Sequence, residues 1–371
     1  MKKDILNKKE IVSVILPTFN ERKNILSILD QLLDLEISRE IELIVVDDNS
    51  YDGTPNIVRK YSKKDRRVRL ISRIGRSGLS SAIKEGCLCA SGEFIFVMDS
   101  DGQHKVDNLK LAMSKLASRK IDLVAGSRFL KDSVIEGLTN ERRSGSTIAN
   151  KFSRISLPNR YSHLTDYMSG FIGFKRSSCI NIIEKIDVNG FKFFYELLAL
   201  SKGSLSIIEI PLEFKERKYG SSKLDPSIVW DFLISLMHTF SKRIIPRRAI
   251  SFAIVGLSGV FVQMIVIYFL ILVTKLNFQQ VLPFGIIMAA SSNYTINNHL
   301  TFRVNKLKGF KFLGGLVKFL LVSSLPIVAN IGVTNLFYSQ FSSNTFFSQL
   351  AGIIVVFIWN YAASSKFVWN F

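Results

Sequence analysis

Acidic residues are absent from the last third of the chain. Residues 249–371 hold none of the 30 Asp and Glu residues and only seven of the 49 Lys and Arg residues, in a stretch dominated by apolar and small side chains. This composition excludes an ordinary water-soluble domain and is typical of membrane-spanning segments. The absence divides the chain into two parts of different kinds.

Cysteine and histidine are scarce, with three and four copies in 371 residues. Cys87 and Cys89 lie close together, but no second ligand pair accompanies them, so reduced and packed thiols are favoured over a zinc site or a disulfide framework. The first ten residues lack the apolar run of a signal peptide, which predicts that the first half of the chain stays in the cytoplasm.

The net charge of +19 raises nucleic acid as a partner, but no motif of that class is present. Beside an apolar half, basic charge fits anionic lipid head groups and phosphorylated substrates better. We therefore expect membrane lipid as a partner and no nucleic acid.

The first half alternates short β-branched runs with helical patterns, which predicts an α/β sheet built from βαβ units. Strands are expected at residues 11–16, 41–46, 68–72 and 93–98, and helices at residues 24–35 and 80–89. Polar residues follow three of these strands, at residues 18–22, 47–52 and 99–103. Ligands of open α/β sheets bind beyond the carboxyl ends of strands, so these segments are expected to converge.

The strongest chemical signal is Asp99-Ser100-Asp101-Gly102-Gln103, which follows the strand expected at residues 93–98. With the two-residue period of a strand, Asp99 and Asp101 project to one side. Carboxylates with few other ligands suit Mg²⁺ or Mn²⁺, which bridges to a diphosphate. Asp-x-Asp is common in ordinary loops, and its place behind an apolar strand favours the metal site.

An amphipathic helix is expected after Asp225-Pro226, a capping residue followed by a good first-turn residue. Asp231, Ser235 and Lys242 lie opposite its apolar stripe. The basic residues that follow favour a helix lying in the membrane interface, and the alternative is an ordinary core-facing helix. The apolar stripe comprises Ile228, Val229, Phe232, Leu233, Leu236, Met237 and Phe240.

Four apolar stretches follow, each near the ~20 residues that a bilayer crossing needs. They cover about residues 250–273, 281–302, 313–338 and 346–367. The basic residues that fall on one side are Arg247, Arg248, Arg303, Lys306, Lys308, Lys311 and Lys366. The opposite loops offer Lys275 alone, so the positive-inside rule predicts that the first half of the chain and both termini are cytoplasmic.

The membrane half repeats itself at an offset of 67 residues. Residues 293–302 resemble residues 360–369, and Phe252 corresponds to Phe319. Duplication of a helix hairpin is the simplest explanation. Asn293, Asn297 and Asn360 are costly against lipid and are expected to face the interior of the bundle.

Five motifs occur in order along residues 12–224: Pro17-Thr-Phe-Asn-Glu21, Val46-Asp-Asp-Asn-Ser-Tyr-Asp-Gly-Thr54, Met98-Asp-Ser-Asp-Gly-Gln-His104, Gly126-Ser-Arg-Phe129 and Ser169-Gly170-Phe171. Together they resemble family 2 glycosyltransferases of the dolichol-phosphate mannose synthase type. The last span pair is similar to the small GtrA-like membrane domain fused to some of these enzymes.

The resemblance implies a GT-A catalytic domain with a Rossmann-like mixed or parallel sheet at residues 1–225. An amphipathic interface helix and linker at residues 226–248 and an all-α, GtrA-like four-helix transmembrane domain at residues 249–371 complete the expected order. It also implies inverting, metal-dependent transfer of a hexose from a nucleotide sugar to polyprenyl or dolichyl phosphate, with GDP-mannose favoured.

Residue by residue, the resemblance implies that Asp99, Asp101 and Gln103 hold Mg²⁺ or Mn²⁺. The residues implied to contact the nucleotide sugar are Pro17, Phe19, Glu21, Asp47, Asp48, Asp99, Ser100, Asp101, Gln103, Arg128, Arg217 and Lys223. Asp47 and Asp52 also suit an Asp-Gly turn, and Glu21 also suits a helix N-terminus. Asp166, Lys192 and Glu196 match further family positions. Lys192 and Glu196 could equally form an ion pair on one face of a helix.

Cations are needed to handle phosphate, and Arg can clamp phosphate oxygens bidentately. The residues expected to carry the reaction are Asp101, Arg128, Arg142, Arg143, Arg217 and Lys223. A phosphate monoester has its second pKa near ~6, so it can attack without a strong general base.

Other readings stay open. UDP-glucose is the second donor, and a non-catalytic membrane scaffold or lipid-linked sugar carrier is the alternative from another class. The intact Asp99, Asp101, Gln103 and Arg217 argue against a scaffold. The oligomeric state is open, a homo-oligomer included.

Overall fold

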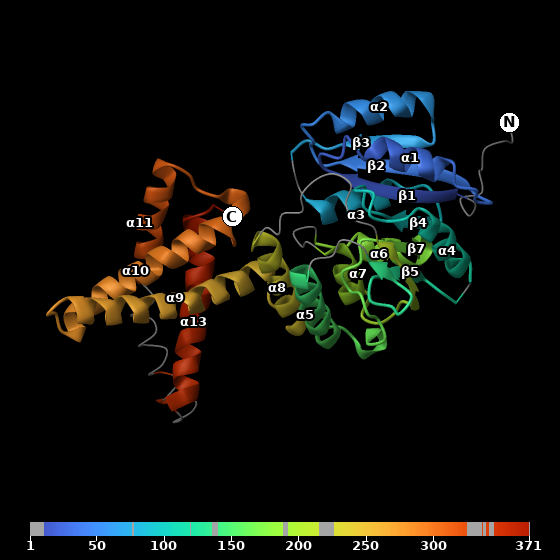
Figure 1. The fold of residues 1–371 in the computed structure, drawn as a ribbon. Helices are drawn as coiled ribbons and strands as arrows, with labels where there is room; N and C mark the ends of the chain where they lie inside the picture. The colour runs from blue at the N-terminus through green and yellow to red at the C-terminus, as the bar shows by residue number, and fades with distance from the viewer. Residues whose placement is uncertain are drawn as a thin grey trace. The chain divides into compact units, whose positions relative to one another are not determined.

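The computed structural model describes residues 11–75, 78–118, 120–135, 140–187, 192–214, 226–324, 336, 339–340 and 345–370. The chain folds as two compact units, Met1–Phe240 and Ser241–Phe371. Figure 1 colours them in chain order, the first unit from blue to yellow and the second from orange to red.

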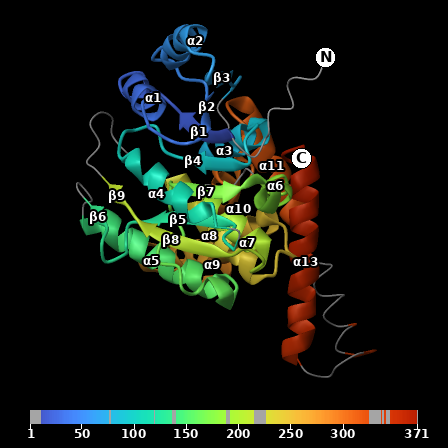
Figure 2. The same cartoon turned by 90° about the vertical axis from the view of Figure 1, so that its right-hand side faces the viewer.

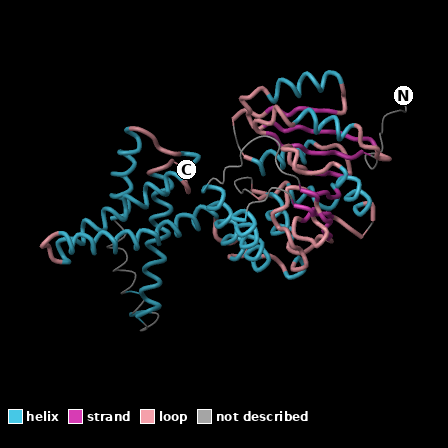
Figure 3. The backbone as a smooth tube through the Cα atoms, in the orientation of Figure 1, coloured by secondary structure: helices cyan, strands magenta, loops and turns pink. Residues whose placement is uncertain are grey.

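A seven-stranded sheet forms the centre of the first unit, drawn in magenta in Figure 3. Its order is β3-β2-β1-β4-β7-β5-β8, and every neighbouring pair is parallel except those of β7, which runs antiparallel to β4 and β5. This mixed sheet confirms the expected fold class. The strands are β1 (Ile11–Thr18), β2 (Glu40–Asp47), β3 (Val68–Ser72), β4 (Phe94–Val97), β5 (Leu123–Ser127), β7 (Ile172–Lys175) and β8 (Ile207–Pro211).

Successive side chains of a strand point to opposite faces of the sheet, so the strands contribute to an apolar cluster on each face. In β1, Val12, Val14 and Leu16 join one buried cluster, whereas Ile15 joins the other. Helices α1 (Ile25–Leu33), α2 (Thr54–Lys64) and α4 (Asp107–Leu116) contribute to the first cluster; α3 (Leu79–Cys89), α6 (Arg176–Ile183) and α7 (Phe193–Ser201) contribute to the second. Figure 2 shows α1 and α4 on one side of the sheet and α3 and α6 on the other.

The remaining elements of the first unit are short or lie against this sandwich. A two-stranded parallel sheet joins β6 (Val134–Ile135) to β9 (Glu213–Phe214), and a 3₁₀ turn, η1, covers Asn159–Tyr161. Helix α5 (Asn140–Ser156) contacts α8 (Pro226–Phe240).

Helix α8 forms where it was expected, and its apolar stripe divides between two surroundings. Leu236 is buried, and the Phe232 ring meets Tyr195 of α7 edge-on at 5.8 Å, so this part of the stripe packs against the protein. Ser235, expected opposite the stripe, is only 4% exposed. A row four residues apart, Val229, Leu233 and Met237, is left exposed, with Phe240 beyond it.

Every described element of the second unit is helical (Figure 3). The helices are α9 (Arg247–Val273), α10 (Phe278–His299), α11 (Phe310–Ser324) and α13 (Thr345–Phe367), with a 3₁₀ turn, η2, at Arg303–Asn305. Asn277 caps α10 through a reciprocal pair of hydrogen bonds with Gln280, which fixes the turn after α9. Among the described residues, α9 is the helix whose length and composition suffice to cross a membrane.

An aromatic cluster forms the core of the second unit, and it follows the 67-residue repeat. Phe302 stacks on its counterpart Trp369 with ring centroids 4.1 Å apart and planes 8° apart. Phe252 meets Phe302 edge-on, and its counterpart Phe319 meets Trp369 in the same way. The two repeats therefore contribute equivalent rings to one core.

Polar side chains of the second unit turn inward. Trp369 Nε1 donates to Asn298 Oδ1 at 3.1 Å, and Asn297, almost fully buried, accepts from the Thr301 hydroxyl at 2.7 Å. A methyl group on Gly259 of α9 would overlap the Asn293 side chain of α10, so these two helices pack closely there.

Candidate active site

The polar segments expected to converge do meet at one edge of the sheet. The carboxyl ends of the parallel strands β1, β2, β4 and β5 lie there, together with the amino end of antiparallel β7. The Ser100 hydroxyl donates to the Pro17 carbonyl at 2.6 Å, joining the segment after β4 to the end of β1. Sequence reasoning therefore located the edge correctly.

The segments after β1 and β2 interlock. The Asn20 amide donates to Ser50 Oγ at 2.8 Å, and the Tyr51 amide returns a bond to Asn20 Oδ1 at 3.1 Å. Asn20 and Asn49 both adopt left-handed backbone, with φ of 60° and 64°, a conformation that Asn tolerates better than most residues. The two loops form one rigid rim.

Two of the aspartates on this rim serve the turns. Asp47 accepts from the Ser50 amide at 2.9 Å and from its hydroxyl at 2.6 Å. Asp52 accepts from the Thr54 amide and hydroxyl and from the Arg22 amide at 3.0 Å. Burial alone would raise the pKa of Asp52, but these hydrogen bonds outweigh it and lower the pKa below its usual value.

Asp48 is buried and faces a different set of donors. Arg73 Nη1 lies 2.8 Å from Asp48 Oδ1, and the Gly78 amide donates to Oδ2 at 2.9 Å. Arg73 is itself fixed by Glu85, 2.9 Å from its Nε. The Asp48 carboxylate is therefore held in one orientation at the end of β2.

Phe19 and Glu21 lie on the same rim. The Phe19 ring meets Tyr51 edge-on at 6.0 Å, and Tyr51 is highly exposed. Glu21 Oε2 accepts from the Asn24 side chain at 2.7 Å, just before α1 begins. Glu21 therefore contacts the residue that precedes α1, as its alternative role at a helix N-terminus requires.

The paired carboxylates after β4 differ in exposure. The Asp99 side chain is 34% exposed, with Oδ2 3.5 Å from His104 Nε2. Asp101 is only 4% exposed and accepts from the Gln103 amide at 3.1 Å. A methyl group on Gly170 would overlap Asp99 Oδ2, so the absence of a side chain at Gly170 makes room for that carboxylate.

These residues fit a hard divalent cation that takes few ligands from protein. Among the described residues no group of three or more His, Cys, Asp and Glu side chains could hold a metal ion. Mg²⁺ at nucleotide sites uses one or two carboxylates with water and phosphate oxygens, and Asp99 and Asp101 match that donor set.

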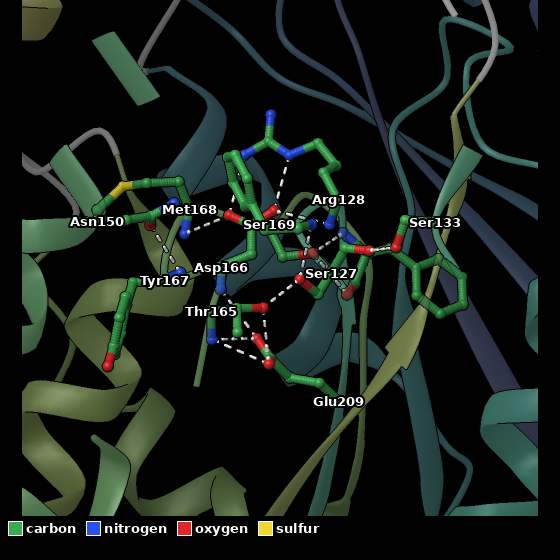
Figure 4. Close-up of polar contacts among 12 residues, drawn as sticks. Ser127, Arg128, Ser133, Asn150, Thr165, Asp166, Tyr167, Met168, Ser169 and Glu209 are labelled. Atoms are coloured by element: carbon green, nitrogen blue, oxygen red, sulfur yellow. Dashed lines mark hydrogen bonds and ion pairs between the residues drawn. The ribbon is translucent and has the colours of Figure 1, made fainter. Parts of the chain in front are cut away.

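Arg128, the residue after β5, is clamped by Asp166. Arg128 Nε donates to Asp166 Oδ2 at 2.7 Å and Nη2 donates to Oδ1 at 3.0 Å, a bidentate pair around a fully buried carboxylate. Burial opposes the charge of Arg128, but Asp166, aided by Asp99, holds the pKa of its guanidinium above the usual value. Figure 4 shows its third nitrogen pointing away from Asp166.

Lys192 shares this electrostatic environment. Burial first, and then the positive charge of Arg128, lower the pKa of Lys192 to about 8, against the opposing effects of Asp99 and Asp166. Lys192 precedes α7 and its carbonyl accepts from the Glu196 amide at 3.1 Å. The edge therefore gathers two cations, Arg128 and Lys192, within electrostatic reach of Asp99 and Asp166.

Sequence reasoning missed Glu209 of β8. Its carboxylate accepts from the amides of Thr165 and Asp166, each at 2.9 Å, directly beneath the Arg128 clamp (Figure 4). The available signal was a lone carboxylate among apolar residues in Ile207-Ile-Glu-Ile-Pro211.

The side chains of four expected cations lie outside the part of the chain that the structure describes. Arg217 and Lys223 lie outside the described residues, and Arg142 and Arg143 lie on α5 with side chains outside the described part of the chain.

Residues 13–183 match the profile described as Glycosyl transferase family 2, and residues 251–369 match that described as GtrA/DPMS, transmembrane domain. Dolichol-phosphate mannosyltransferase of Pyrococcus furiosus is 32% identical over 254 residues, 68% of this chain and 70% of the relative. The protein of that name from Saccharomyces cerevisiae is 31% identical over 237 residues, 62% of this chain and 86% of the relative.

A solved structure of glucosyl-3-phosphoglycerate synthase from Mycobacterium tuberculosis, in complex with Mn²⁺, UDP-glucose and phosphoglyceric acid, is 18% identical. The match covers 64% of this chain and 81% of the synthase chain, with a TM-score of 0.47. A likeness at this level does not bear on the ligands of this chain.

The mixed sheet and the matched profiles define the class, a glycosyltransferase with a GT-A-like domain and a helical transmembrane domain of the GtrA/DPMS kind. More particularly, the chain belongs to glycosyl transferase family 2.

Proposed function

We propose that this glycosyltransferase moves a hexose from a nucleotide sugar to polyprenyl phosphate, with mannose from GDP-mannose as the favoured donor group. The observation that carries the proposal is the placing of Asp99 within electrostatic reach of the clamped Arg128 and of Lys192, at the sheet edge where Asp101 follows. The names of the relatives in Pyrococcus and Saccharomyces support the acceptor and the sugar.

On the donor side, Asp48 accepts hydrogen bonds from the base or ribose, because Arg73 and Gly78 already hold it in place. Phe19, Pro17 and Glu21 line the same rim. Asp99, Asp101 and Gln103 would hold Mg²⁺ or Mn²⁺, which supplies charge against the diphosphate of the departing nucleotide.

On the acceptor side, the phosphate monoester is itself the nucleophile, since it is largely anionic at neutral pH with a second pKa near ~6. A single displacement inverts the anomeric centre. Arg128 and Lys192 hold phosphate oxygens in position, and electrostatics and orientation supply most of the rate. Arg142, Arg143, Arg217 and Lys223 are proposed as further phosphate contacts.

The acceptor's lipid chain requires a membrane beside the catalytic domain. The exposed apolar row on α8, Val229, Leu233 and Met237, suits a helix in the interface. We place four spans in residues 249–371, with the catalytic domain and both termini cytoplasmic, on the strength of the one-sided basic loops.

A donor panel tests the choice of sugar. Full-length protein in detergent is given polyprenyl phosphate, Mg²⁺ and each of several labelled GDP- and UDP-sugars, and label in the organic extract is counted. GDP-mannose is expected to give the highest kcat/KM. Preferred use of UDP-glucose would refute the proposed donor while leaving the reaction class in place.

A further inference from the structure

Glu209 lies in β8, the last strand of the seven-stranded sheet, between Ile208 and Ile210 and opposite Ala125 of β5. The residue is half-buried, so its carboxylate has lost part of its hydration, and hydrogen-bond donors of the protein offset that loss. The identity of these donors shows what the carboxylate holds in place.

The donors come from one turn. Both Glu209 oxygens accept from the Thr165 amide at 2.9 Å, Oε1 also accepts from the Asp166 amide at 2.9 Å, and Oε2 accepts from the Thr165 hydroxyl at 2.9 Å. Two consecutive backbone amides are thus aimed at one carboxylate. This fixes the orientation of the peptide that carries Asp166.

Asp166 passes that orientation to Arg128. Its two oxygens take Arg128 Nε and Nη2, and they also accept from the Arg128 amide at 3.3 Å and the Met168 amide at 3.1 Å. Backbone amides thus hold the Asp166 carboxylate in place, and the carboxylate in turn holds the Arg128 guanidinium through two hydrogen bonds. Figure 4 shows the order Arg128, Asp166, Thr165 and Glu209.

A second path from Glu209 reaches the backbone beside Arg128. The Thr165 hydroxyl lies 2.6 Å from the Ser127 hydroxyl, which in turn accepts from the Phe129 amide at 3.0 Å. Ser127 and Phe129 flank Arg128. Glu209 therefore constrains the arginine through its side chain and through its main chain.

We infer that Glu209 is a positioning residue for transfer: it fixes the Thr165–Asp166 turn and thereby aims the Arg128 guanidinium at the reacting phosphate. The inference rests on the proposed function, because the reacting group is taken to be a phosphate.

Folding disfavours the charge of Glu209. Burial raises the pKa of the Glu209 carboxyl, and the charge of Asp166 raises it further, against the hydrogen bonds from Asp166 and Thr165. A raised pKa means that folding favours the protonated carboxyl over the ionised one. Glu209→Gln keeps the shape but turns one acceptor into a donor facing the turn.

Glu42 offers a matched control at the other end of the sheet. It also accepts from an amide, that of Ser91 at 3.0 Å, and from the Ser13 and Ser91 hydroxyls, each at 2.7 Å. Burial opposes its charge, but these hydrogen bonds and Arg69 lower the pKa of Glu42 below its usual value. Glu42→Gln is therefore expected to lower the melting temperature and to leave kcat unchanged.

The test is a double-mutant cycle on full-length protein, with Glu209→Gln made in the wild type and in Arg128→Ala, and transfer to polyprenyl phosphate measured. In the wild-type background kcat should fall about tenfold, with the KM for the nucleotide sugar unchanged and every rate measured well below the melting temperature of the variant. In the Arg128→Ala background the same change should cost less than about twofold, because a residue that acts through Arg128 has nothing left to position.

Equal losses in both backgrounds, or no loss in the wild type, would overturn the inference. A wild-type chain without turnover would instead refute the proposed function. Hydrogen exchange over residues 165–168 gives a readout free of activity: the Thr165 and Asp166 amides should exchange faster in Glu209→Gln and not in Glu42→Gln, and unchanged exchange would contradict the role of Glu209. If Glu209→Gln does not fold, Glu209→Asp, which withdraws the carboxylate by one methylene, replaces it in both experiments.

Discussion

At the scale of single residues, the site depends on how closely the chain approaches its carboxylates. Gly170 and Gly173 lie three residues apart, and a methyl group at either would overlap a neighbour: Asp99 Oδ2 in the first case, the Phe96 ring in the second. The carboxylate end can move aside, whereas the packed ring cannot. The two positions therefore separate effects on the site from effects on the fold.

We expect Gly170→Ala to lower kcat about tenfold or more while the melting temperature changes little, since Asp99 is displaced from the proposed metal site. Gly173→Ala should lower stability by about 1–3 kcal/mol, the usual cost of overpacking, with kcat retained in the folded fraction. Thermal unfolding and initial rates on the same preparations measure both. Loss of stability in Gly170→Ala without loss of kcat would remove Asp99 from the site.

Lys192 gives a pH-dependent prediction. Its pKa is about 8 in the folded chain against 10.5 ordinarily, so folding disfavours the charged form. That cost is present below pH 8, shrinks as the pH rises and disappears above 10.5. Metal-free Lys192→Met should therefore melt higher than the wild type at pH 7, with the difference closing between pH 8 and 10.5. A constant difference across that range would contradict the lowered pKa.

At the scale of elements, α8 is the proposed contact of the first unit with the membrane interface. Burying a leucine side chain contributes about 1.5–3 kcal/mol, so a charge in its place should cost acceptor affinity. We expect Leu233→Glu to raise the KM for polyprenyl phosphate about tenfold, with nucleotide affinity unchanged. Leu111→Glu on α4 is the control, because Leu111 is 38% exposed and Leu233 is 40% exposed. Equal effects of the two changes would exclude a lipid-facing role for α8.

Elements with strong local patterns could be read from the sequence, and elements fixed by distant contacts could not. The first four strands alternate clearly, and α1 carries Ile25, Ile28, Leu29 and Leu32 on one buried stripe, so their places were predicted to within a few residues. Strand β7 has four residues and an antiparallel register set by neighbours elsewhere in the chain. No periodic pattern in its own sequence shows that β7 lies between β4 and β5.

The same division holds for the site. Asp99 and Asp101 were found because they are neighbours behind a strand. The partner of Arg128 is 38 residues away, and Glu209 is a further 43 residues from Asp166. Only the pairing of β5 with β8 brings Glu209 under that clamp.

At the scale of the whole molecule, the charge asymmetry carries a topological prediction. Asn277 lies in the turn between α9 and α10, whereas Lys308 lies in the basic loop before α11. In a background without Cys87, Cys89 and Cys179, we expect Asn277→Cys to react with a membrane-impermeant maleimide from outside sealed right-side-out vesicles, and Lys308→Cys to react only after lysis. Labelling of both from the same side would overturn the proposed orientation.

Asp101 carries the central claim, because it is the buried carboxylate of the proposed metal site. The direct measurement is incorporation of labelled mannose from GDP-mannose into polyprenyl phosphate by full-length wild type and by Asp101→Asn. We predict an organic-extractable product that EDTA abolishes, and a loss of at least about a hundredfold in Asp101→Asn, in line with the worth of electrostatic groups at reacting centres, with the melting temperature retained. Equal, EDTA-resistant incorporation by the two proteins would contradict the account.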